Sequence, residues 1–110
     1  MTSIPIDAGH LTIETTRDED AVWVILQGEA DIATLQHLEA ALARIGLDGA
    51  RRVHLQVTDL DFADVATLRQ LTFFARRARQ AGRDVMTVGA RPVLRKVAQL
   101  MSVHHDLGLA

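Results

Sequence analysis

The chain has 110 residues and no cysteine, so it is long enough for one domain with a buried core and holds no disulfide framework. It is weakly acidic, with a formal net charge of −2, and it contains one tryptophan, three phenylalanines and no tyrosine. No apolar run approaches the ~20 residues of a membrane span, and residues 1–10 lack the features of a signal peptide. We therefore expect a single domain over residues 1–110, in the cytoplasm and without a membrane partner.

The first half of the chain predicts a β-hairpin. We expect residues 1–10 to be irregular, residues 11–15 to form a strand because polar and apolar side chains alternate, and residues 16–20 to form a charged turn. Residues 21–26 are a continuous apolar run, which indicates a central strand covered on both faces. The short connection between these two strands predicts an antiparallel pair.

A helix over residues 32–45 is expected next. Residues 28–31 end the preceding strand, and Asp31 is placed to cap the helix by accepting hydrogen bonds from its first N–H groups. The apolar side chains recur at helical spacing on one stripe, which comprises Leu35, Leu38, Leu42 and Ile45.

A strand, a loop and a helix over residues 52–82 organise the rest of the chain. Residues 53–57 alternate and predict a strand with unlike faces, and residues 58–63 predict a short acidic turn. Asp64 stands before a long helical pattern as its N-cap, and Gly82 suits the position just after its end. The helix N-terminus should therefore project at one end of the sheet, where α/β proteins commonly bind their ligands.

The end of the chain predicts a fourth strand over residues 84–88, closed by Gly89, and a third helix with Pro92 at its first position. Residues 102–110 are expected to add a partial turn or a short helix. The apolar face of the third helix is expected to comprise Val93, Leu94, Val97, Leu100 and Met101.

The order of these elements, β-β-α-β-α-β-α, predicts an α/β fold. The sheet should be mixed, with about four strands, of which the N-terminal hairpin is antiparallel and the later strands are parallel. About three to four helices should cover it.

The helix after Asp64 has two unlike faces. One face, with Leu68, Leu71 and Phe74, is expected to be core, so Phe73 should point away from it. An exposed aromatic side chain among arginines is the composition of a binding hot spot; the alternative is that Phe73 packs under a neighbouring loop or helix. The outward face comprises Ala66, Gln70, Phe73 and Arg77, flanked by Arg69 and Arg76.

Charge is divided unevenly between the two halves of the chain. Residues 1–50 carry two arginines and nine acidic residues, a net of −7, whereas residues 51–110 carry ten basic and five acidic residues, a net of +5. Solvated helix faces are the ordinary explanation, and a basic surface that meets an acidic partner is the functional one. Nucleic-acid binding is not favoured, because the total charge is negative and aromatic side chains are few.

Catalytic and metal-binding patterns are scarce in the sequence. It contains no Ser-His-Asp constellation, Gly-rich phosphate loop or HExxH motif. His104 and His105 are adjacent, so their side chains should point in different directions and a two-ligand metal site is not expected. His54 is expected to be a half-buried polar residue. We expect no enzymatic activity, no metal and no cofactor.

Three segments resemble a known family. They are GEAD at 28–31, LQVTDLDFADVATL at 55–68, and VGARPVLRKVAQLM at 88–101. Through them the chain resembles a STAS domain, the fold of bacterial anti-sigma factor antagonists, from residue 11 to about residue 109. The resemblance implies a protein partner, an anti-sigma factor that is also a serine kinase, which binds the unphosphorylated antagonist.

The family motif is Phe-x-Asp-Ser-Ser/Thr-Gly-Leu, placed between a strand and a helix. Phe62, Asp64 and Leu68 match this motif. The resemblance implies that the second hydroxyl of the motif is the phosphoacceptor, and this hydroxyl is missing here. The chain therefore keeps the frame of the motif and lacks its chemistry.

The positions of the two hydroxyl residues hold Val65 and Ala66, and the position of the glycine holds Thr67. Gln56 replaces the acidic residue that usually ends the third strand. Because Ala66 has no acceptor atom, the usual switch cannot operate there. Thr67 is one residue late and is a substitute candidate; the alternative is that its hydroxyl only serves the helix N-terminus.

The function expected from the resemblance is that of a non-catalytic regulatory protein. It would bind an anti-sigma factor of the serine-kinase type, or a related regulator, without a phosphate switch, as a monomer or weak dimer. The alternative is a module that senses a nucleotide or another small molecule at the same end of the sheet. The expected partner-binding residues are Asp31, Asp64, Val65, Ala66, Thr67, Arg69, Gln70, Phe73 and Arg77.

Overall fold

A computed structural model describes residues 6–8 and 10–109 of the chain. These residues form six strands and three helices. Their bounds are β1 (Ile6–Ala8), β2 (Leu11–Asp18), β3 (Ala21–Ala30), α1 (Leu35–Arg44), β4 (Arg52–Gln56), β5 (Leu60–Ala63), α2 (Val65–Gln80), β6 (Asp84–Val88) and α3 (Pro92–Leu100).

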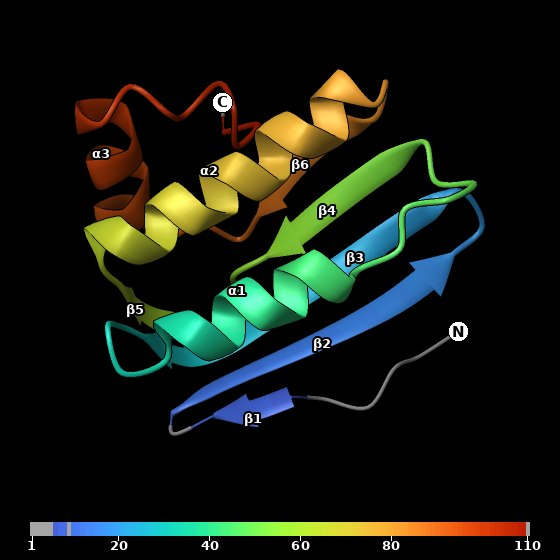
Figure 1. Ribbon diagram of the computed structural model, residues 1–110. Coiled ribbons are helices and arrows are strands. Elements are labelled where there is room, and N and C mark those ends of the chain that lie inside the picture. Colours follow the sequence, from blue (N-terminus) through green and yellow to red (C-terminus); the bar gives the residue numbers. More distant parts are fainter. Residues whose placement is uncertain (1–5, 9, 110) are drawn as a thin grey trace.

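The strands form one mixed sheet in the order β1-β2-β3-β4-β6 (Figure 1). β1, β2 and β3 pair antiparallel, and β4 and β6 continue the sheet in parallel. β5 also pairs parallel with β3, over Gly28 to Ala30, where β4 has already ended. The expected mixed α/β fold is confirmed, and β1 and β5 add two strands to the four that were predicted.

Several predicted boundaries were wrong because strand pairing extends further than local sequence indicates. β2 continues to Asp18, so the charged turn contains only two residues before β3. β3 runs on through residues 28–31 as far as Ala30. Residues 60–63, expected in an acidic turn, form β5, and residues 6–8, expected to be irregular, form β1. The prediction for residues 1–5 and 9 lies outside the described part of the chain.

Gly28 allows β3 to change partners without ending. Its φ is +101°, and an added Cβ would lie 1.8 Å from the backbone oxygen of His10, so no other residue fits there. The Gly28 N–H donates to the Asp59 oxygen at 2.9 Å, and the pairing of β3 with β5 shifts register at this point. The sheet therefore forks at Gly28, and the fork carries β5 and the start of α2.

The core lies between one face of the sheet and the helices α1 and α2 (Figure 1). Every second residue of the central strands points into it, as their alternation predicts. The α2 face that was expected to be core is buried, which confirms that prediction. The main contributors are Val22, Val24 and Leu26 of β3, Val53 and Leu55 of β4, Leu38 and Leu42 of α1, and Leu68, Leu71 and Phe74 of α2.

The expectation that β3 is covered on both faces was wrong. Val22 and Val24 are fully buried, but Trp23 and Ile25, which point to the other face, are only half-buried. Trp23 stacks on His54 of the neighbouring strand, with ring centroids 4.3 Å apart. Both helices that pack on the sheet lie on the opposite side (Figure 1), so this face is left open.

α3 begins at Pro92 as predicted, and part of its expected apolar face packs against the core through Leu94, Val97 and Met101. Val93 and Leu100 are 75% and 76% exposed, and only Ala98 is buried. α3 stands beside the N-terminal end of α2 (Figure 1) and does not lie flat on the sheet, so only part of its surface is buried. Residues 102–109 form turns, and three of their apolar side chains are buried: Val103, Leu107 and Leu109.

Candidate functional site

The N-terminal end of α2 is held by Asp64 at the fork of the sheet. The Asp64 carboxylate accepts a hydrogen bond from the Thr67 N–H at 2.9 Å, which confirms the predicted N-cap. The Asp64 N–H donates to the backbone oxygen of Ala30 at 3.2 Å. The helix end is therefore attached to β3, and the residues that follow Asp64 project from the edge of the sheet.

Apolar side chains project where the hydroxyl groups of the family motif were expected. Val65 is 45% exposed, and Ala66 next to it is half-buried. Ile32 follows the end of β3, Phe62 lies in β5, and Val93 follows the end of β6. Because β3, β5 and β6 run in the same direction, their carboxyl ends meet at one edge of the sheet. We call Ile32, Phe62, Val65, Ala66 and Val93 the apolar tip.

A hollow separates β5 from α3 within this tip. It has a volume of about 480 Å³ and lies between Phe62 on one wall and Val93 on the other. An ion pair of 3.1 Å joins Arg91 to Asp61 in the same hollow. The sequence analysis missed this hollow, because Phe62 lies two residues after the buried Leu60 and simple alternation would place both side chains on the inner face.

Thr67 is not accessible at the tip. Its side chain is fully buried, and its hydroxyl has no hydrogen-bond partner among the described residues. The alternative prediction, that this hydroxyl serves the helix N-terminus, was wrong because the hydroxyl makes no hydrogen bond there. It is the carboxylate of Asp64 that accepts from the helix N-terminus, through the backbone N–H of Thr67. The burial has a simple origin: Thr67 lies four residues before Leu71 and therefore shares the inner face of α2.

Asp31 supports a turn and not the first turn of a helix. Its carboxylate accepts hydrogen bonds from the N–H groups of Ala33 and Thr34 at 3.0 and 3.3 Å. α1 begins only at Leu35, three residues later than predicted, and its N-cap Thr34 makes no side-chain capping bond. The turn places Ile32 in solvent, where it is almost fully exposed.

Phe73 points away from the core, as predicted, and is 57% exposed. It stands between two hollows on either side of α2. One, of about 370 Å³, faces α1 and is lined by Gln70 and Arg77, and the other, of about 330 Å³, is lined by Val65 and Arg69. The outward face of α2 is therefore a ridge with a groove on each side.

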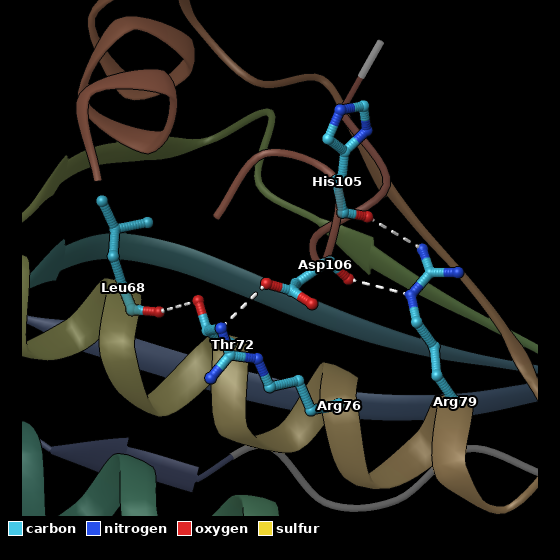
Figure 2. Close-up of polar contacts among 6 residues, drawn as sticks. All are labelled: Leu68, Thr72, Arg76, Arg79, His105 and Asp106. Carbon is cyan, nitrogen blue, oxygen red and sulfur yellow. Dashed lines mark hydrogen bonds and ion pairs between the residues drawn. The ribbon is translucent and has the colours of Figure 1, made fainter. Parts of the chain in front are cut away.

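The arginines of α2 largely bind other parts of the same chain. Arg77 donates to the Leu42 oxygen at 3.3 Å, and Arg76 forms an ion pair with Asp106 at 3.1 Å. Figure 2 shows Arg79 reaching the C-terminal turns, where it donates to the oxygens of His105 and Asp106; it also donates to the Val85 oxygen at 2.8 Å. Arg69 makes no hydrogen bond or ion pair with any described residue.

The adjacent histidines His104 and His105 belong to no metal-ligand cluster in the described part of the chain. The rings of His104 and His105 are tilted against each other, with centroids 4.3 Å apart. Within residues 6–8 and 10–109, no group of three or more His, Cys, Asp or Glu side chains could hold a metal ion. In the same residues, no helix has the length and apolar character that crossing a membrane requires.

A family model described as "Mlab, STAS domain" matches residues 13–109. The chain therefore belongs to the STAS-domain family, which confirms the resemblance inferred from its motifs. STAS proteins of the anti-sigma factor antagonist group are typically non-catalytic, in agreement with the expectation that this chain is not an enzyme.

Solved structures of anti-sigma factor antagonists share the fold. An anti-sigma factor antagonist from Mycobacterium paratuberculosis is 18% identical, with a TM-score of 0.74, 94% of this chain covered and 89% of the other. The Bacillus cell fate determinant SpoIIAA in its phosphorylated form is 20% identical, with a TM-score of 0.63 and coverages of 89% and 90%. Unphosphorylated SpoIIAA is 19% identical, with a TM-score of 0.67 and coverages of 89% and 87%. No curated protein matches the sequence.

Proposed function

We propose that this chain is a regulatory binding domain whose partner contact is permanent and not switched by phosphate. The partner would be an anti-sigma factor of the serine-kinase type or a related regulator, because the solved structures that share the fold are anti-sigma factor antagonists. The contact would include the apolar tip and the adjoining outward face of α2. Its candidate residues are Asp31, Asp64, Val65, Ala66, Arg69, Gln70, Phe73 and Arg77. Thr67, which the sequence analysis grouped with them, is fully buried and is left out.

One observation carries this proposal: no hydroxyl group is presented at the exposed start of α2. Val65 and Ala66 occupy the two motif positions that reach the surface, and neither has an oxygen. The hydroxyl of Thr67 is inside the protein, where a kinase cannot transfer a phosphoryl group to it without local unfolding. An apolar surface of this kind can still support tight binding, because buried apolar contact is a main source of affinity.

Binding to a purified serine-kinase anti-sigma factor of the host, measured by calorimetry with ADP and with ATP, tests the proposal. We expect the same dissociation constant with either nucleotide and no phosphate on the chain by mass spectrometry. Val65→Asp should weaken binding by about tenfold or more, because a charge would be buried at the contact. Asp59→Ala, an exposed change outside the tip, is the control.

Two results would contradict this proposal in different ways. Absence of binding to every such anti-sigma factor of the host rejects the class of partner. Stoichiometric phosphate on Thr67, together with loss of binding, rejects the permanent contact. It would show that a phosphate switch operates at Thr67, one residue after the position of the motif phosphoacceptor.

Small-molecule sensing is the second candidate, and the hollow between β5 and α3 favours it. Its volume of about 480 Å³ falls within the range of ligand sites, roughly 300–1,000 Å³. A shift of the melting temperature by ATP, ADP or GTP that disappears in Val93→Asp would support sensing. Unchanged melting with all three nucleotides would speak against it.

A further inference from the structure

One face of the sheet lacks a covering layer and presents both apolar and polar side chains. Purely parallel sheets are almost always covered on both faces, and β3, β4 and β6 form the parallel part of this mixed sheet. α1 and α2 cover one side (Figure 1), and the described helices leave the other side bare. We call this side the open face; its central residues are Trp23, Ile25, His54, Gln56, Met86 and Val88.

These central residues form two rows across the strands. Trp23, His54 and Met86 are in register, and so are the three residues of the next row. Trp23 stacks on His54 with an angle of 15° between the rings, and Met86 at the end of the row is 54% exposed. The apolar side chains Trp23, Ile25 and Val88 are half-buried, so this face offers a mixed surface of apolar and polar groups to a partner.

We propose that the open face docks a second copy of this chain, through a two-fold contact that lays β3 of one copy over β3 of the other. This surface lies on the side of the sheet opposite to α2, so the proposal goes beyond the partner contact proposed above and does not depend on it. Two sheets that pack face to face in this way form a sandwich, a standard arrangement of β-structure.

Charge complementarity supports a second copy as the occupant. β2 and β4 flank β3, so a two-fold axis along β3 lays β2 of one copy over β4 of the other. Asp18 and Arg52 are both in register with Ala21, which places Asp18 opposite Arg52 of the second copy. Thr16 and His54 are both in register with Trp23, which places Thr16 opposite His54 of the second copy. The symmetry makes each contact twice.

Arg52 is free to take part in this contact. It already forms an ion pair with Asp20 at 3.1 Å, but the two side chains are 56% and 38% exposed. An exposed pair of this kind contributes little on its own. Arg52 can therefore bridge Asp20 of its own chain and Asp18 of the second copy, since its guanidinium carries five N–H donors.

The size of the open face indicates a weak dimer. Strands lie about 4.8 Å apart and rise about 3.3 Å per residue, so β2, β3, β4 and β6 span about 19 Å in width, and the eight residues of β2 about 26 Å in length. The projected area is roughly 500 Å², below the roughly 800 Å² per partner of a standard stable interface. We therefore expect reversible association at micromolar concentrations.

The wild-type chain offers an internal probe, because Trp23 is its only tryptophan. Sedimentation equilibrium from low to high micromolar concentration should follow a monomer–dimer equilibrium. Over the same range the emission of Trp23 should shift to the blue and acrylamide should quench it less, since the ring loses contact with water. A chain that stays monomeric at every concentration overturns the proposal.

Variants test which face is used and how it is oriented. Met86→Lys should weaken dimerisation by about tenfold or more. Leu100→Lys, at an even more exposed apolar residue on α3, is the control and should leave dimerisation unchanged. Asp18→Arg should weaken the dimer, and the double variant Asp18→Arg with Arg52→Asp should restore it.

The variants also give outcomes that reject the proposal. A dimer that survives Met86→Lys, or that Leu100→Lys weakens equally, rejects the open face as the interface. Failure of the double variant to recover, with circular dichroism unchanged, rejects the placement of β2 over β4.

Discussion

At its N-terminal end α2 exposes Val65 and Ala66, whereas at its C-terminal end Arg76 and Arg79 reach across to bind the C-terminal turns (Figure 2). The N-terminal end carries the residues that match the family motif, and its exposed side chains are mostly apolar. The C-terminal end has the sequence of a basic surface, but most of its arginine side chains already bind other parts of the same chain. Exposed charge on this helix is therefore a poor sign of a free binding surface, because three of its four arginines bind other parts of the same chain.

The C-terminal end of α2 is also closed by its own backbone. Gly82 has a φ of +83°, and its N–H donates to the Arg79 oxygen at 2.9 Å. The Arg83 N–H reaches back to the Ala78 oxygen at 3.1 Å, and the two bonds together form a Schellman motif. Gly82 thus ends the helix as predicted. The nearby Arg76 and Arg79 connect α2 to the C-terminal turns.

The largest effect should separate two neighbouring phenylalanines, which mark the border between core and surface. Phe74→Ala should lower the free energy of unfolding by ~3–5 kcal/mol, because Phe74 is only 2% exposed. Phe73→Ala should cost less than ~1 kcal/mol but weaken partner binding by ~2 kcal/mol or more if Phe73 anchors the partner. Urea unfolding and calorimetry measure the two quantities. A Phe73→Ala protein that is stable and binds normally would remove Phe73 from the contact.

Replacing single arginines should distinguish those that stabilise the fold, such as Arg79, from those that do not, such as Arg69. Arg79→Ala should cost ~2 kcal/mol of unfolding free energy, because three backbone oxygens lose a charged donor. Arg69→Ala should change it by less than ~0.5 kcal/mol, since Arg69 holds nothing in the described structure. Thermal melts of the two variants check this order. Equal destabilisation by both would show that the contacts of Arg79 do not fasten the C-terminal turns.

A smaller effect is expected at the cap. Asp64→Ala should lower the free energy of unfolding by ~1 kcal/mol, because the Thr67 N–H loses its acceptor. Asp59→Ala removes an exposed carboxylate from the same loop and should have almost no effect. An unchanged melting curve for Asp64→Ala would mean that Asp64 is kept for another purpose, such as contact with the partner.

The smallest effect concerns Ala66, the position at which the family motif would place a phosphoacceptor. Ala66→Ser should change stability by less than ~0.5 kcal/mol and should remain unphosphorylated after incubation with a serine-kinase anti-sigma factor and ATP. The reason is that Thr67 replaces the motif glycine and Gln56 the nearby acid, so the surroundings of the acceptor are also absent. Intact-mass spectrometry decides the point. Stoichiometric phosphate at position 66 would show that a single hydroxyl is enough to restore the switch.

Local sequence patterns predicted the main frame well. The alternation of residues 53–57 and the continuous run of residues 21–26 identified β4 and most of β3, and Asp64 and Gly82 marked the two ends of α2. These signals work because side-chain direction and capping depend on neighbours in the sequence.

Features that depend on distant contacts were missed. β5 contains two exposed residues after an acidic loop, and only its pairing with β3 makes it a strand. The periodicity of α3 shows which residues share a face, but not that Val93 and Leu100 of that face remain exposed. The acceptors of Arg79 lie up to 27 residues away along the chain, where no sequence pattern points to them. The burial of Thr67, by contrast, could have been predicted from its spacing to Leu71.

The fork at Gly28 separates the apolar tip from the ladders of the central sheet. The ladders that join β3 to β4 and β4 to β6 end before the fork, so the hydrogen bonds of the central sheet do not involve β5 or the start of α2. Substitutions at the exposed residues Phe62 and Val65 should therefore cost the central sheet little, whereas Leu60 of β5 belongs to the core.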